Sequence, residues 1–232
     1  LTSLGLRLGP SSSVKVDANV LASFPQFLRH LHFGFVDSIS DSLVPLLPAF
    51  LETLHLEHNS RISNAGIQNL PESLTSLHLP NNYLLTPTCL PHIPRAVTSL
   101  SIRTSEAITE PLMVTLPPLK FLTLEGSQPP GGPAIAALPA TLQSLVWNFR
   151  RPLEALELSL LPTALQELTC SISRDPSTLQ DRSLLRTLEA LPRGLHSLCI
   201  LTGPTVYLSE DLAGLPKGLR SLELRSDKYL ST

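Results

Sequence analysis

One phrase recurs along the whole chain and limits the folds available to it. The phrase is apolar-Pro-x-x-Leu-x-x-Leu-x-Leu, and it fills residues 47–56 and again residues 70–79. Its first leucine, or the residue that replaces it, stands at positions 1, 28, 51, 74, 97, 119, 142, 165, 195 and 219. The steps between these positions are 27, 23, 23, 23, 22, 23, 23, 30 and 24 residues. A period of this length is typical of a solenoid, in which each repeat is one structural unit.

The leucine spacing predicts a short strand in every copy. The last two leucines of the phrase are two residues apart, so both point to one face of a strand. Such a strand is too short to be stable alone, but parallel copies stacked about 4.8 Å apart bury a continuous leucine column. We therefore expect Leu77 and Leu168 to be fully buried, and Trp147, which stands in a leucine column, to face the core. The composition agrees, because 51 of the 232 residues are leucine.

The remainder of each copy is expected to form an outer layer. The proline before each strand fixes φ and removes an N–H where the chain turns inward. Apolar and partly helical pieces precede the prolines at residues 62–70, 135–138, 183–191 and 208–215. About seven extra residues around positions 174–188 and about four around positions 10–24 are expected as insertions in this layer, and the former are expected to lengthen a helix.

This pattern resembles the leucine-rich repeat family over essentially the whole chain. The family motif Leu-x-x-Leu-x-Leu-x-x-Asn is matched best by residues 51–59 and 74–82, and the Leu-Pro-x-x-Leu phrase is similar to the proline-containing repeats of protist proteins and bacterial effectors. The resemblance implies an α/β fold, a curved right-handed solenoid with a parallel sheet on its concave face. Short helices, 3-10 turns and loops are implied on the convex face. We expect residues 1–232 to form a single domain of about ten repeats within a longer protein.

In the family the motif asparagine bonds backbone along a ladder. Asn59 and Asn82 occupy that position here, so we expect ladder bonds from both. The equivalent positions of the other copies are filled by shorter or different side chains, namely Ser105, Ser127, Arg150, Ser173, Gly203 and Asp227. The ladder is therefore expected to be absent there or made by hydroxyl groups.

Charge, hydropathy and motifs exclude several functions. A net charge of −2 gives no electrostatic footprint for nucleic acid, and 22 prolines interrupt every apolar stretch, which predicts no membrane span. No nucleophile elbow, phosphate loop, dinucleotide motif or zinc-protease motif occurs, so we expect no enzyme and no cofactor. Cys89, Cys170 and Cys199 form no CxxC pair, and Cys170 and Cys199 are predicted on opposite faces of the sheet. Free thiols favour a cytoplasmic location, and a cell-surface location stays open.

The outward residues of the strands form columns on the concave face. One column stacks His32, His55 and His78 on adjacent strands, with His30 beside them. Imidazoles about 5 Å apart suit a metal or an anion, a pH sensor, or contact with a partner, and a polar column without a role is the plain alternative. Phe121, with Val146 and Leu201, is expected to form an apolar patch.

These columns predict a protein–protein interaction module that binds through its concave sheet. The alternatives are a structural or cell-surface assembly component built from repeat arrays, self-association through the repeat ends, and a regulatory domain of a larger signalling protein or effector. No metal site is assigned, and no nucleic-acid partner is expected. The candidate partner-binding residues are His30, His32, His55, Glu57, His78, Arg103, Phe121, Glu125 and Arg225.

Overall fold

A single parallel sheet runs through the molecule. The computed structural model describes residues 1–7, 15–34, 38–57, 59, 61–171, 187–202 and 211–226. Its ten strands lie side by side in sequence order. They are β1 (Ser3–Arg7), β2 (His30–Gly34), β3 (Thr53–Glu57), β4 (Ser76–Leu79), β5 (Ser99–Thr104), β6 (Phe121–Gly126), β7 (Ser144–Phe149), β8 (Glu167–Ser171), β9 (Ser197–Thr202) and β10 (Ser221–Ser226).

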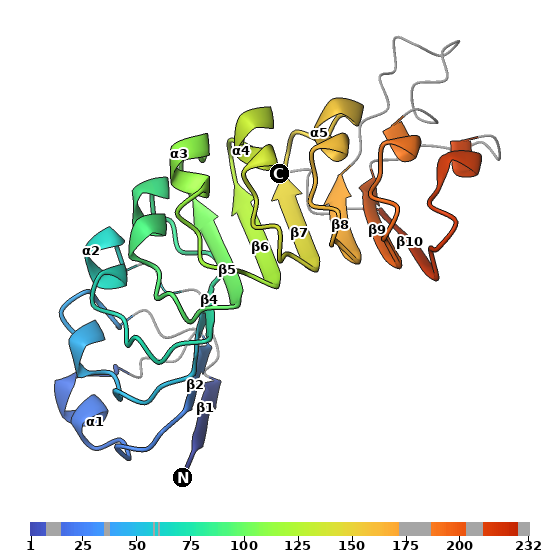
Figure 1. The fold of residues 1–232 in the computed structure, drawn as a ribbon. Helices are drawn as coiled ribbons and strands as arrows, with labels where there is room; N and C mark the ends of the chain where they lie inside the picture. The colour runs from blue at the N-terminus through green and yellow to red at the C-terminus, as the bar shows by residue number, and fades with distance from the viewer. Residues whose placement is uncertain are drawn as a thin grey trace.

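The strands line the inner side of an arc, and short helices cover its outer side (Figure 1). The predicted leucine-rich-repeat solenoid, with its sheet on the concave face, is therefore confirmed. Of the expected outer pieces, residues 62–70, 135–138 and 208–215 overlap α2, α4 and η4, and the described part of the piece at residues 183–191 is helical at residues 187–189. The insertion at residues 174–188 falls almost wholly outside the described residues. The convex elements are α1 (Ala18–Ala22), η1 (Val44–Leu46), α2 (Asn64–Ile67), η2 (Pro87–His92), α3 (Glu110–Met113), α4 (Gly132–Ala136), α5 (Ala155–Ser159) and η4 (Asp211–Gly214).

The leucine columns form the core between the sheet and the outer layer. Leu77 has no exposed surface and Leu168 is 2% exposed, as the spacing predicted. Trp147 is also fully buried, and its ring packs against Phe149 with 4.8 Å between the ring centroids. Cys170 is buried and Cys199 is only half-buried, which agrees with their placement on opposite faces. The sequence register therefore holds along the sheet.

The proline of the repeated phrase begins a tight turn into the strand that follows it. In eight copies the proline carbonyl accepts a hydrogen bond from the N–H three residues later, as from Leu51 N–H to Pro48 O at 3.1 Å. This bond closes a β-turn, which aims the chain from the outer layer toward the sheet. The copy that lacks one residue tightens the turn, because Leu119 N–H reaches Pro117 O at 2.7 Å. The recurring phrase thus sets where every strand starts.

The asparagine ladder exists at two positions and is replaced by hydroxyls further along. Asn59 and Asn82 are buried, and the Asn82 side-chain amide donates to Ile62 O at 2.9 Å and accepts from Leu84 N–H at 3.1 Å. At the equivalent position of the next copy, Ser105 Oγ donates to a backbone carbonyl at 3.3 Å. The expectation of a ladder partly made by shorter hydroxyls is confirmed for the described copies.

Candidate protein-binding face

Three histidines stack across neighbouring strands of the concave face. The sheet register pairs His32 on β2 with His55 on β3, and His55 with His78 on β4. The rings of His32 and His55 are almost parallel, at 3° and 4.1 Å between centroids. The ring of His78 is tilted by 35° and lies 5.3 Å from that of His55. The column expected from the sequence is a packed stack.

Hydroxyl groups lie beside the histidines, and burial affects the charge state at one end of the stack. Ser76 Oγ lies 2.8 Å from His78 Nε2, and on the neighbouring strands Thr53 Oγ1 lies 3.1 Å from His30 Nδ1. Burial lowers the pKa of His78 below its usual 6.5, and the nearby charge of His32 lowers this pKa further. Near neutral pH the His78 ring at this end of the stack is therefore uncharged and can both donate and accept hydrogen bonds.

The stack geometry does not suit a metal ion. Imidazole lone pairs lie in the ring plane, so two parallel stacked rings turn their faces, and not their nitrogens, toward each other. Within the described part of the chain, no group of three or more His, Cys, Asp or Glu side chains is arranged to hold a metal.

An arginine on β5 contacts an aromatic ring in the loop after β4. The Arg103 guanidinium of β5 lies 4.6 Å from the ring centroid of Tyr83, which belongs to the loop after β4 and is 59% exposed. Tyr83 and its exposed neighbour Leu84 are absent from the sequence-based candidates. The signal that points to them is their place directly after Asn82, where the chain leaves the sheet at the edge of the concave face.

An exposed phenylalanine and a carboxylate lie on the next strand. Phe121 at the start of β6 is 49% exposed, and half-buried Val146 and Leu201 stand on β7 and β9. Glu125, later on β6, pairs in register with Arg103 and accepts a hydrogen bond from Asn148 at 3.3 Å. The middle of the concave face thus carries both apolar and charged groups within two strands.

The partner-binding residues predicted from the sequence lie in two groups on neighbouring strands, and Arg225 lies apart from both groups. The stacked histidines and His30 occupy β2 to β4, while Arg103, Phe121 and Glu125 occupy β5 and β6. Arg225 stands four strands beyond β6 on β10, roughly 19 Å away at about 4.8 Å a strand, and donates to exposed Glu223 at 2.7 Å. The side chain of Glu57 lies outside the described residues.

Comparison with known proteins places the fold. No protein-family profile matches the sequence, and no curated protein matches it. Among solved structures, the leucine-rich repeat-containing protein LegL7 from Legionella pneumophila is similar at a TM-score of 0.55 and 18% identity, over 97% of this chain and 83% of that one. An internalin from Listeria monocytogenes is similar at a TM-score of 0.56 and 19% identity, over 93% of this chain and 67% of that one.

These similarities define the class of fold and nothing finer. The chain is a leucine-rich-repeat solenoid, because its ten parallel strands and its structural neighbours agree. Sequence identities of 18% and 19% to these two proteins do not indicate what this chain binds. In the described part of the chain, no helix is long and apolar enough to cross a membrane.

Proposed function

We propose that this chain is a protein-interaction module and that its concave sheet is the binding face. The observation that carries the proposal is the histidine stack beside the Arg103–Tyr83 pair and Phe121, all near one face of five consecutive strands. Arginine and tyrosine are enriched among residues that dominate binding energy. Side chains held on rigid strands lose little entropy on binding, so they suit a preformed contact surface.

We infer that the repeats are of the proline-containing variety. The support is the turn that each proline begins, because the bond from the proline carbonyl to the third residue recurs at the same place in eight described copies. The proline therefore has the same structural role in these eight copies.

Binding without catalysis fits the chemistry of the thiols. Burial raises the pKa of Cys89 and of Cys170 to about 12, so both are protonated and inert at neutral pH. The pKa of half-buried Cys199 is raised as well, chiefly by burial. None of the three thiols has the lowered pKa of a cysteine nucleophile.

Site-specific photocrosslinking tests the concave face. A photoreactive amino acid replaces Thr123, in the middle of the sheet, and in a matched protein it replaces Leu156, which is exposed on the convex helix α5. We expect a discrete adduct with a cellular protein from position 123 and not from position 156. The purified partner should then bind Phe121→Ala and Arg103→Ala variants at least tenfold more weakly, with unchanged circular dichroism. Equal crosslinking from both positions contradicts the proposal.

Assembly through the sheet is a second candidate function, favoured by one observation. Leu222 and Leu224 of β10 are exposed by 38% and 44%, although the residues at the same positions of β2 to β9 are buried, as Leu198 is. Apolar side chains and a strand edge of this kind pair readily with another repeat or another chain. Light scattering checks this, since Leu222→Glu should reduce the mass in solution if copies associate through β10. An unchanged mass contradicts it.

A further inference from the structure

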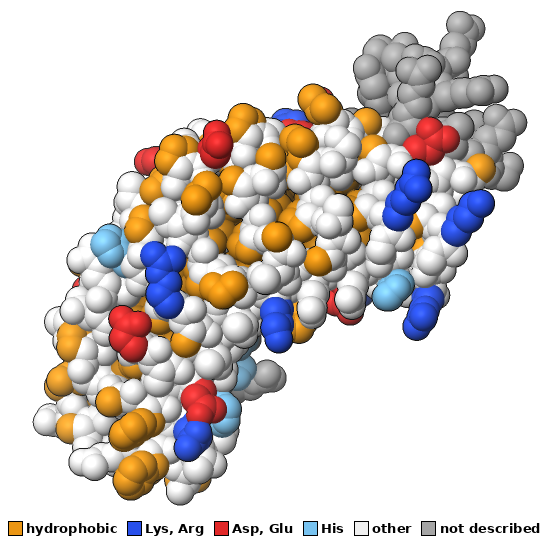
Figure 2. Space-filling model, viewed as in Figure 1, with side chains coloured by type: hydrophobic (Ala, Val, Ile, Leu, Met, Phe, Trp, Pro, Cys, Tyr) orange, Lys and Arg blue, Asp and Glu red, His pale blue; other side chains and the backbone are white. Residues whose placement is uncertain are grey.

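A cluster of positive charge lies away from the concave face, on the edge of the solenoid where the strands begin. We call this edge the strand-start rim; it consists of the residues between each proline and the following strand. Arg193, His196, Lys217 and Arg220 stand on the rim of the last two repeats, and all four are exposed. Figure 2 shows blue and pale-blue side chains gathered at this end of the molecule. The equivalent positions of the two preceding repeats are uncharged, namely Ala140, Gln143, Thr163 and Gln166.

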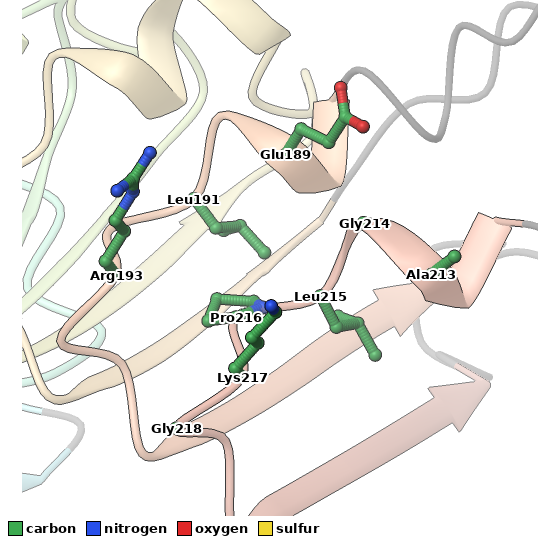
Figure 3. Close-up of a pocket in the computed structure, with 9 residues that line it drawn as sticks. All are labelled: Glu189, Leu191, Arg193, Ala213, Gly214, Leu215, Pro216, Lys217 and Gly218. Atoms are coloured by element: carbon green, nitrogen blue, oxygen red, sulfur yellow. The ribbon is translucent and has the colours of Figure 1, made fainter.

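A cavity opens beside these cations, lined by both of the last two repeats. Its volume is about 610 Å³, and its apolar lining includes Leu191, Leu215 and Pro216. Figure 3 shows Leu191 and Leu215 extending in the same direction from successive turns of the chain, with Glu189 at the helical end of the cavity.

Arg193 and Lys217 hold corresponding positions at the rim side of this cavity. Each directly follows the turn proline of its repeat and directly precedes a glycine. At the second of these glycines, Gly218, an added Cβ would lie 3.9 Å from the carbonyl oxygens of both Arg193 and Leu195, which is ordinary van der Waals contact, so the two turns lie against each other. The rim therefore offers two corresponding cationic side chains and a partly apolar hollow beside them.

The charges and the size of this surface select one class of ligand. Arg193, Lys217 and Arg220 are cationic side chains, and Glu189 is the one carboxylate among the described residues that line the cavity. The surface is therefore attractive to anions, mainly through charges that remain hydrated. Three fixed cations are few for a nucleic acid, whose binding proteins commonly contact about six to ten phosphates. A simple inorganic anion has no apolar group to pack against Leu191, Leu215 and Pro216, so it would leave this part of the cavity unfilled.

We propose that this cavity and its rim bind an acidic segment of a protein partner, with an apolar side chain in the hollow and carboxylates at the cations. In an extended segment, residues two apart lie about 6.6 Å apart on one side. Arg193 and Lys217 both line the cavity and have long, flexible stems, so each can meet a different carboxylate of such a segment. This surface is separate from the concave face, so its occupancy does not depend on the function proposed above.

Fluorescence anisotropy with a labelled peptide of alternating Glu and Leu tests this site. We expect saturable binding that weakens as salt rises, and at least fivefold weaker binding by the double variant Arg193→Ser, Lys217→Ser. Both residues are exposed, so the variant should keep its circular dichroism. The matched control, Arg95→Ser with Lys120→Ser, removes two cations from the same rim in earlier repeats and should bind the peptide unchanged.

Further arms decide between the proposal and its alternatives. Glu189→Gln should strengthen peptide binding, because it removes the carboxylate that lines the cavity. Phe121→Ala, on the concave face, should leave peptide binding unchanged, which separates this site from the concave one. Peptide binding that is absent or not saturable overturns the proposal. Equal weakening by the control variant, or tighter binding of duplex DNA than of the peptide, also overturns it.

Discussion

Removing one ladder asparagine should destabilise the solenoid far more than removing the serine that stands in its place one repeat later. The Asn82 side chain is 1% exposed and bonds two backbone groups that belong to different repeats, Ile62 O and Leu84 N–H. Asn82→Ala leaves both groups without this partner. Ser105 makes one longer bond, at 3.3 Å to Leu85 O, which also accepts a bond from Ser105 N–H at 3.1 Å.

The loss of unfolding free energy depends on how deeply each backbone group that loses its hydrogen bond is buried. A buried group that loses its hydrogen bond costs about 1–3 kcal/mol, and a partly wet one costs less. The Ile62 carbonyl meets Asn82 in a buried setting, and Leu84 N–H is only partly buried, so Asn82→Ala should cost about 2–4 kcal/mol. Ser105→Ala should cost under about 1 kcal/mol, because Leu85 O keeps its backbone partner.

Urea unfolding followed by circular dichroism measures the difference, and hydrogen exchange locates it. A loss of about 2–4 kcal/mol lowers the folding constant by roughly thirty- to several-hundredfold. Since repeats couple mainly to their neighbours, exchange should accelerate first in the β3 to β5 repeats. Equal destabilisation by the two variants, or unchanged exchange at Leu84 in Asn82→Ala, refutes the idea that the ladder bonds stabilise the stacking.

Three further perturbations follow from burial, close contact and titration. Leu77→Ala should cost about 2–5 kcal/mol in chemical unfolding, and the same change at exposed Leu222 far less; equal costs would contradict the burial pattern. Gly66→Ala should lower the melting temperature in a thermal melt, because the added Cβ would clash with Asp41 Oδ1, which accepts a hydrogen bond from Ser63 N–H; an unchanged melting temperature would show that the carboxylate moves freely. The pKa of His78 is lowered in the fold, so the unfolded chain binds protons more readily, and stability should be full above pH 6.5 and decline as pH falls through 6.5 toward the lower folded value. An NMR titration giving His78 a pKa at or above 6.5 would contradict this.

The period and the leucine spacing were enough to predict most of the sheet. Side-chain alternation along a strand has a period of two residues, and strands stack in repeat order, so each position of the phrase has one possible face. The histidine column, the buried Trp147 and the opposite orientations of Cys170 and Cys199 follow from that rule alone. The alternation depends only on a residue's position within its own repeat, so the face of each strand residue can be predicted from its number in the sequence.

Only the tertiary structure decided which side chains meet beyond the strands. Tyr83 reaches Arg103 because the chain turns after β4 at Asn81, whose φ is 60°, and the direction of such a loop is not encoded in the repeat period. The same holds for Arg151, which forms an ion pair with buried Glu157 on α5. Strand positions were determined by periodic burial of leucine, which acts in every copy alike. Contacts of the loops and of the outer layer depend on packing between particular side chains, and these differ from one repeat to the next.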